Sequence, residues 1–275
     1  MNETFSFSRF GRYFLFDLKQ TWRRHSRAAI VIGCAGLFFY VIWALFSLVF
    51  NQTWSSPVLG ARMFVFLLAF GILEFYFAYL YGFVTDKKKG SAYLMIPAST
   101  TEKFVSLLLM SLFVVPILFV VVYLGIDGIL SLADPTYGAS LVGSISGGYQ
   151  EMIDMLVSFK GEGFPFSLSQ MVYPILIGFI FNILYYVLCG LCFKKYKIIG
   201  ALAISFLFSI IITMIAGIAA RPIADFVSGL DLENIGSEQL ASFYHTFLAW
   251  TNVITTILTV GLGAGIYYRL KTIKH

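Results

Sequence analysis

The chain has 275 residues, of which 59% are hydrophobic and only 12% are charged, and its formal net charge is +5. Soluble domains average about 45–50% apolar and about 25% charged residues, so this composition excludes a soluble globular protein. The positive charge does not indicate nucleic-acid binding, because the basic residues lie beside long apolar stretches, where they set membrane orientation. The sequence predicts an all-α, polytopic membrane protein that contacts the lipid bilayer and no nucleic acid.

The stretch before the first apolar run is amphipathic. Large apolar residues recur at a spacing of four, at Phe10, Phe14, Leu18 and Trp22, and basic residues lie between them. This pattern predicts an N-terminal helix lying in the membrane interface. Two roles remain open for it: an anchor that steadies the first span, or an element that moves during gating.

Six apolar stretches follow, and each is long enough to cross a bilayer as a helix. About 20 residues at a rise of about 1.5 Å span a hydrocarbon core of about 30 Å. We expect a single transmembrane domain over residues 1–275, with spans at about 28–50, 61–84, 104–126, 171–193, 198–220 and 244–268. Two longer connections, 127–170 and 221–243, form outer segments with room for short helices but not for a separate catalytic domain.

The basic residues indicate the topology. Sixteen of the 19 lysines and arginines fall in the N-terminal arm, in the second-to-third and fourth-to-fifth connections, and in the C-terminal tail. Only Arg62, Lys160 and Arg221 remain for the opposite face. The positive-inside rule then places both termini in the cytoplasm.

Two residues inside the predicted spans are unusual there. Glu74 lies near the middle of the second span, where an ionised carboxylate costs at least about 2.5–3.5 kcal/mol. Since no lysine or arginine lies mid-span, we expect a neutral partner, with Asn182 in the fourth span as one candidate. Glu74 is either a residue of a transport or proton path, or a protonated acid that joins two helices. Pro116 in the third span removes a backbone donor and predicts a helix kink.

The connection between the second and third spans, residues 85–103, combines three features. It contains three consecutive lysines, a helix break at Pro97, and the sequence Ser99-Thr-Thr-Glu102. The last fits a capping box, in which the Ser99 hydroxyl accepts from the Glu102 amide and the Glu102 carboxylate accepts from the Ser99 amide. A short apolar segment, 92–96, is therefore separated from the start of the third span.

Two short motifs carry a family resemblance. The connection reads Met95-Ile-Pro-Ala-Ser99 followed by Glu102-Lys103, and the tail reads Tyr267-Tyr-Arg-Leu-Lys271. With the six-span layout, these residues resemble the permease subunits of type-2 ATP-binding-cassette (ABC) exporters, especially compact six-span bacterial members. The chain departs from many members in its long outer segment 127–170, where they have a short turn.

The resemblance implies a cytoplasmic coupling loop that docks on a separate ABC ATPase and transmits its closure to the spans. The residues expected to bind this partner or to fix the loop are Tyr93, Leu94, Met95, Pro97, Ser99, Glu102 and Lys103. The chain has no phosphate-binding G-x-x-x-x-G-K-[ST] loop. We therefore expect no enzymatic activity, cofactor or metal in this chain, and ATP and magnesium in the partner.

The resemblance further implies two permease chains, as a homodimer or a heterodimer, in the cytoplasmic membrane of a bacterium. The alternative is an ATP-independent channel or a proton-coupled secondary transporter that uses Glu74. The substrate stays open among lipid, peptide, drug and polysaccharide, because no motif encodes it.

Overall fold

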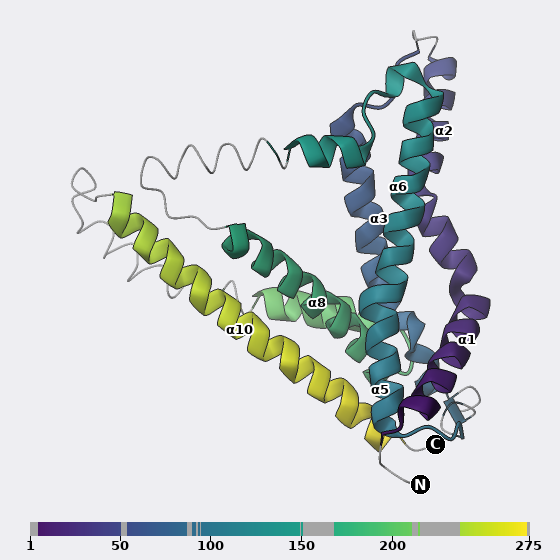
Figure 1. Cartoon of the computed structure of the whole chain (residues 1–275), viewed down its shortest axis with the longest axis vertical. Coiled ribbons are helices and arrows are strands. Elements are labelled where there is room, and N and C mark those ends of the chain that lie inside the picture. The colour runs from purple at the N-terminus through teal and green to yellow at the C-terminus, as the bar shows by residue number, and fades with distance from the viewer. Residues whose placement is uncertain are drawn as a thin grey trace.

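Every regular element in the described part of the chain is helical (Figure 1). The computed structural model describes residues 5–50, 54–86, 90–91, 93, 95–148, 150, 168–210, 214 and 237–273. The principal elements are α1 (Phe7–Gly33), α2 (Ala35–Val49), α3 (Leu59–Leu80), the 3-10 helix η1 (Gly82–Thr85), α5 (Thr100–Leu109), the π-helix η2 (Met110–Val114), α6 (Val115–Ala133), the 3-10 helix η3 (Pro135–Tyr137), α8 (Leu168–Cys192) and α10 (Ser237–Thr272).

Four helical segments in this part are long and apolar enough to cross a membrane. They are Leu59–Thr85, Thr100–Ala133, Val172–Cys192 and Leu248–Thr272. A bent pair, Ser26–Gly33 with Ala35–Val49, makes a fifth if it is counted as one span. These segments confirm that the described part of the chain is all helical and that several of its helices are apolar enough to cross a membrane. The predicted span 198–220 coincides with a shorter apolar helix, Lys197–Ile210, and most of its remainder lies outside the described residues.

The N-terminal helix is longer than the amphipathic stretch from which it was predicted. Helix α1 runs without interruption to Gly33, and the break at Cys34 falls inside the predicted span 28–50. The two halves meet at 49°. At this bend the backbone packs against α6, since a methyl group on Gly33 would lie 2.8 Å from the Val122 side chain. The amphipathic stretch and the first part of the predicted span 28–50 therefore belong to one helix, α1, and the rest of that span belongs to α2.

The third span changes its hydrogen-bond register just before Pro116, the residue at which the sequence predicted a kink. Pro116 is the second residue of α6, and Val115 separates it from the π-helical stretch Met110–Val114. Proline has no N–H, so the α-helical ladder cannot continue through it, and a π-helical stretch accommodates the gap with i→i+5 bonds. The segment Thr100–Ala133 nevertheless continues as one span.

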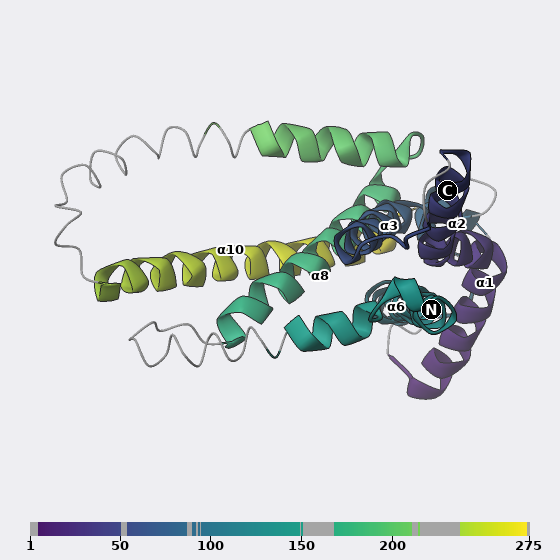
Figure 2. The same ribbon diagram turned by 90° about the horizontal axis from the view of Figure 1, so that it is seen from above.

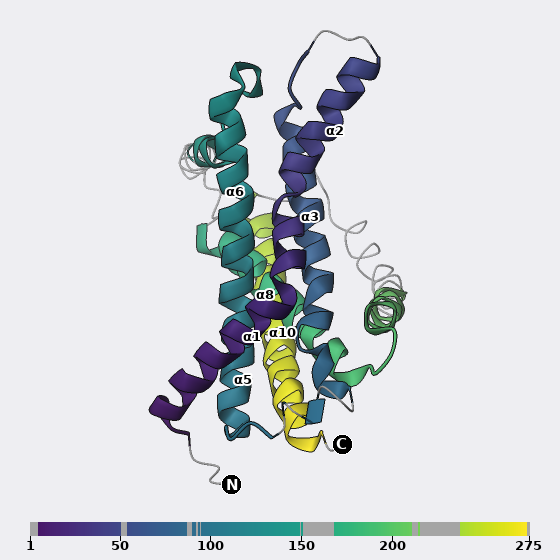
Figure 3. The ribbon, with the colours of Figure 1, turned by 90° about the vertical axis from the view of Figure 1, so that its right-hand side faces the viewer.

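The helices form an upright group and a splayed pair. Helices α2, α3 and α6 stand side by side. Helices α8 and α10 cross each other near one end of the molecule, and toward the opposite end they extend away from the upright group (Figure 1, Figure 2). The start of α1 and the end of α10 lie at the same end of the molecule, which we call the basal end (Figure 3). The opposite end, where α2 and α6 finish, is the distal end. A core of buried side chains from α3, α5, α6, α8 and α10 holds the group together.

Helices α3 and α8 touch through their backbones. A methyl group on Gly190 of α8 would clash with the carbonyl oxygen of Ala78 on α3. The Ala78 oxygen belongs to the backbone and not to a flexible side chain, so the two helices would have to separate to admit the methyl group. Glycine at this position lets the two backbones approach closely, as in other membrane helix pairs.

We expect Gly190→Ala to destabilise the folded protein by about 1–3 kcal/mol, the usual cost of overpacking a close contact. The matched control is Gly178→Ala on the same helix, because a methyl group there meets nothing within 4 Å. The thermal midpoint of unfolding in detergent should fall for the first variant and stay or rise for the second. Equal midpoints would show that α3 and α8 are not in this contact.

Candidate functional site

The start of α5 is held by the capping box that the sequence predicted. The Glu102 amide donates to Ser99 Oγ at 3.2 Å, and Glu102 Oε2 accepts from the Ser99 amide at 2.9 Å. Ser99 itself is extended, which turns the incoming chain into the helix. This confirms the reciprocal cap, and it fixes where the connection 85–103 ends.

The same carboxylate also holds the N-terminal helix. Glu102 Oε1 accepts from the Ser6 amide at 3.0 Å, and the Arg9 guanidinium contacts both oxygens at 2.7–2.9 Å. Glu102 is 0% exposed, so its charge depends on these donors. Charge-assisted, bidentate pairs of this kind are the stronger hydrogen bonds in proteins. We call Ser6, Arg9, Ser99 and Glu102 the Glu102 cluster; it ties the first turn of α1 to the first turn of α5.

Lys103 holds the connection from the other side. Its Nζ donates to the Tyr93 carbonyl oxygen at 3.0 Å and lies 5.1 Å from the centre of the Tyr93 ring. That ring packs edge-on against Phe83 at 5.7 Å between centroids. Neighbouring residues of α5 thus hold two different elements: Glu102 holds α1, and Lys103 holds the connection.

The residues predicted to dock a partner are not equivalent. Tyr93 is buried in the core, so its ring supports the connection from inside. Met95 is 81% exposed and Pro97 is also exposed, while Leu94 lies outside the described residues. The docking role stays a prediction, with Met95 and Pro97 as the accessible residues among those described.

Asp17 is a buried acid that the sequence reading missed. Its Oδ2 accepts from the Tyr81 hydroxyl at 2.7 Å and from Ser106 Oγ at 2.6 Å. Three segments meet there: α1, the residue after α3, and α5. Burial raises the pKa of Asp17, and the hydrogen bonds from Ser106 and Tyr81 oppose the rise. The sequence did contain a sign that Asp17 is buried: it is the only acid between residues 5 and 33, and it shares a helix face with the apolar residue Phe14.

Two basic residues at the basal end interact with the carbonyl ends of helices. Lys197 Nζ donates to the Gly82 carbonyl oxygen just after α3 and to Thr85 Oγ1 at 2.9 Å. Arg269 Nε donates to the Leu191 carbonyl oxygen in the last turn of α8 at 3.1 Å. Cations suit helix C-termini, where unpaired carbonyls concentrate partial negative charge. Lys197 and Arg269 were counted among the basic residues that indicate topology. They also join neighbouring spans.

Within the membrane-spanning part, Glu74 lies beside Asn182. The side chains of these two residues interact between α3 and α8, and Asn182 is the residue that the sequence offered as a candidate neutral partner for Glu74. Glu74 is only partly buried. The pair is a polar contact between α3 and α8, which also contribute apolar side chains to the buried core.

The distal end has its own ion pair. Arg62 Nη1 lies 3.4 Å from Asp127 Oδ1, both side chains are 4% exposed, and Arg62 Nη2 donates to the Ala139 carbonyl oxygen at 2.7 Å. Asp127 also accepts from the Tyr137 hydroxyl at 2.9 Å and from the Leu141 amide. The pair joins α3 to α6 and fastens the segment that follows α6. The sequence reading left Arg62 as an unassigned outer charge.

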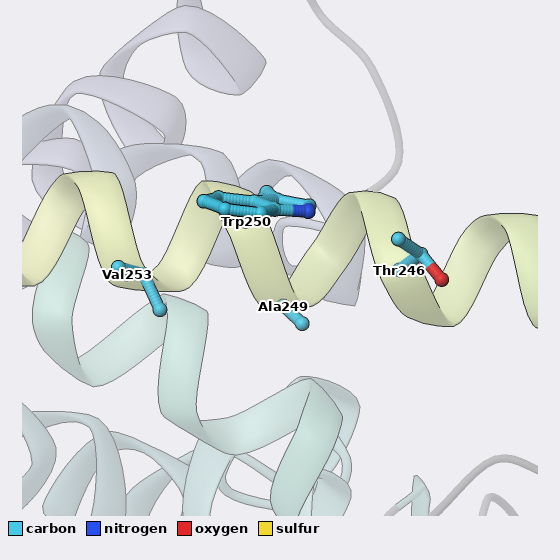
Figure 4. A pocket seen from close by; sticks show the side chains of 4 residues that line it. All are labelled: Thr246, Ala249, Trp250 and Val253. Carbon is cyan, nitrogen blue, oxygen red and sulfur yellow. The ribbon is translucent and has the colours of Figure 1, made fainter.

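Two hollows accompany these clusters. One of about 430 Å³ lies against α10 and is lined by Thr246, Ala249, Trp250 and Val253, with no titratable group among them (Figure 4). Another of about 400 Å³ lies at the basal end between α1 and the connection, and its lining consists of Arg9, Arg12, Tyr13, Phe16, Ile96, Pro97 and Ala98. The second adjoins the exposed end of the connection, so it belongs to the candidate coupling site.

The Glu102 cluster predicts a specific energetic coupling. Arg9→Gln should lower the thermal midpoint clearly in the wild-type background but little in a Glu102→Gln background, because the partner charge is then gone. Arg12→Gln is the control, since its exposed side chain on the same helix does not contact Glu102. Its effect should be equal in both backgrounds. If the changes in thermal midpoint caused by Arg9→Gln and Glu102→Gln were additive, the two side chains would not interact.

Asp17 predicts a pH dependence. Because its pKa is raised on folding, the folded state keeps the proton more tightly than the unfolded chain does. The stability gained in this way is complete below the unfolded pKa of about 4 and is lost as the pH rises through the folded value. Asp17→Asn keeps an acceptor oxygen and cannot ionise, so its midpoint should rise relative to wild type as the pH increases above about 4. Parallel curves would show that Asp17 does not titrate there.

Comparison with known proteins finds no relative from which a function could be transferred. No family model matches the chain, and neither a curated protein nor a solved structure matches it. The function must therefore be argued from the residues and geometry described above.

Proposed function

We propose that this chain is the membrane permease subunit of a bacterial ABC exporter, in the cytoplasmic membrane with both termini in the cytoplasm. Separate ATPase subunits would dock at the connection 85–103 and drive alternating access through it. The observation that carries the proposal is the double attachment at the start of α5, where Glu102 holds α1 and Lys103 holds the connection.

This attachment supports a mechanical role for the connection. Its first end is tied to the chain after α8 by Lys197, its second end is fixed by the capping box, and Lys103 holds Tyr93 between the two ends. A displacement of the connection therefore acts on α3, α5 and α1 together. A loop attached only at its two ends would absorb such a displacement.

The exposed part of the connection supports a docking role. Met95 is 81% exposed, although Tyr93, Ala98 and Ser99 around it are buried. A flexible, polarizable methionine adapts well to a partner surface. The hollow between α1 and residues 96–98 lies next to it, with Arg12 on its wall, so a partner meets apolar and basic groups at one place.

The division of labour follows from the resemblance and the sequence. The chain has no phosphate-binding loop, so ATP and magnesium would be held by the ATPase, and this chain would contribute no enzymatic activity. Two permease chains, identical or different, would enclose the transport path. The alternative, a channel or proton-coupled transporter, is supported by the contact between Glu74 and Asn182.

The test is co-purification of the chain from its native membrane. We expect a P-loop ATPase in the complex, and we expect Met95→Asp to reduce its recovery several-fold, because an acid would replace the exposed apolar contact. Tyr196→Asp is the matched control, since Tyr196 is 74% exposed in the other short basic connection. Transport without any associated ATPase, or an undiminished complex with Met95→Asp, would refute coupling through this connection.

A further inference from the structure

Helix α1 has an exposed face that the Glu102 cluster and Asp17 do not use. On this face lie three large apolar side chains: Phe7 is 84% exposed, Leu15 is 65% exposed and Trp22 is 52% exposed. Three exposed basic residues accompany them, namely Arg12, Lys19 and Arg23. A face of this composition calls for a partner that is both apolar and negatively charged.

The two kinds of side chain form separate, adjacent strips. At about 100° per residue, Phe7, Trp22 and Leu15 project into one sector of the helix and the basic residues into the next. Lys19 and Arg23 are four residues apart, so they are neighbours on the helix surface. Within the described part of the chain, no hydrogen bond or ion pair joins either of them to another residue. Their charges therefore remain available to an external anion.

A narrow crevice lies beside Trp22, at one end of the apolar strip. It runs between α1, α3 and the π-helical region, encloses about 30 Å³, and is lined by Leu18, Thr21, Trp22, Ser26, Ala29, Tyr76, Leu80, Met110, Val114, Val115 and Leu118. Trp22 forms part of its rim and is also half exposed. The crevice admits only a thin apolar group, such as a methylene segment, and the basic strip lies directly beside its rim.

We propose that α1 binds an anionic phospholipid of the adjoining leaflet. The headgroup phosphate lies between Lys19 and Arg23, and an acyl chain passes along Trp22 into the crevice. Charge complementarity selects the anionic headgroup, since basic side chains at a membrane surface attract anionic lipid. One phospholipid contacts Trp22 with its acyl chain and Lys19 and Arg23 with its headgroup, whereas a free anion would leave Trp22 exposed. The proposal requires that α1 lie at a membrane, and it does not depend on ATP-driven transport.

The test uses quenching of Trp22 fluorescence in reconstituted full-length protein. Brominated phosphatidylglycerol or brominated phosphatidylcholine is diluted into phosphatidylcholine vesicles. For equal quenching of Trp22, we expect roughly a tenth as much of the brominated phosphatidylglycerol to be needed. The contribution of Trp22 is obtained by subtracting the quenching of Trp22→Phe. The double substitution Lys19→Gln and Arg23→Gln should abolish most of this preference.

The matched control removes two exposed lysines elsewhere at the basal end, as Lys194→Gln with Lys195→Gln. It should leave the preference unchanged. Thermal midpoints in detergent establish that each variant is folded. Equal quenching by the two lipids would overturn the proposal, and so would an equal loss in the control, which would indicate general attraction to surface charge.

Discussion

The basal end of this protein depends on the buried Glu102 carboxylate. A carboxylate withdrawn from water is stable only when donors occupy its oxygens, and a buried charge that loses its partner is costly. Here the donors come from the backbone before α1, from the Arg9 guanidinium and from the Ser99 amide. The position of the N-terminal helix is therefore determined by a residue almost a hundred positions further along the chain.

The Arg62–Asp127 pair has the corresponding role at the distal end. Between the two ends, α3, α6 and α8 meet through apolar side chains, and the Glu74–Asn182 contact joins α3 to α8. Apolar contacts discriminate poorly between helices in a membrane, because lipid is as apolar as a neighbouring helix. The polar pairs thus specify which helix ends belong together, while apolar packing fills the space between them.

Features that depend on local sequence were predictable, and those that depend on distant partners were not. The capping box involves residues three positions apart, and the long apolar segments are recognised by length alone. By contrast, the Arg62–Asp127 pair joins residues 65 positions apart, and the burial of Asp17 depends on Tyr81 and Ser106. Tyr93 was expected to bind a partner or to fix the connection, and its burial against Lys103 and Phe83 could not be read from the sequence. The break at Cys34 could not be predicted, because no proline or turn motif lies there.

The π-helical stretch before Pro116 gives this span an unusual mechanical character. Its basal part is held by Glu102 and its distal part by Asp127, so neither end can turn freely about the helix axis. A change from i→i+5 to i→i+4 bonding rotates one half of a helix against the other by about one residue, or about 100°. A torque applied to α5 would therefore meet a change of hydrogen-bond register at Met110–Val114 before it reached α6.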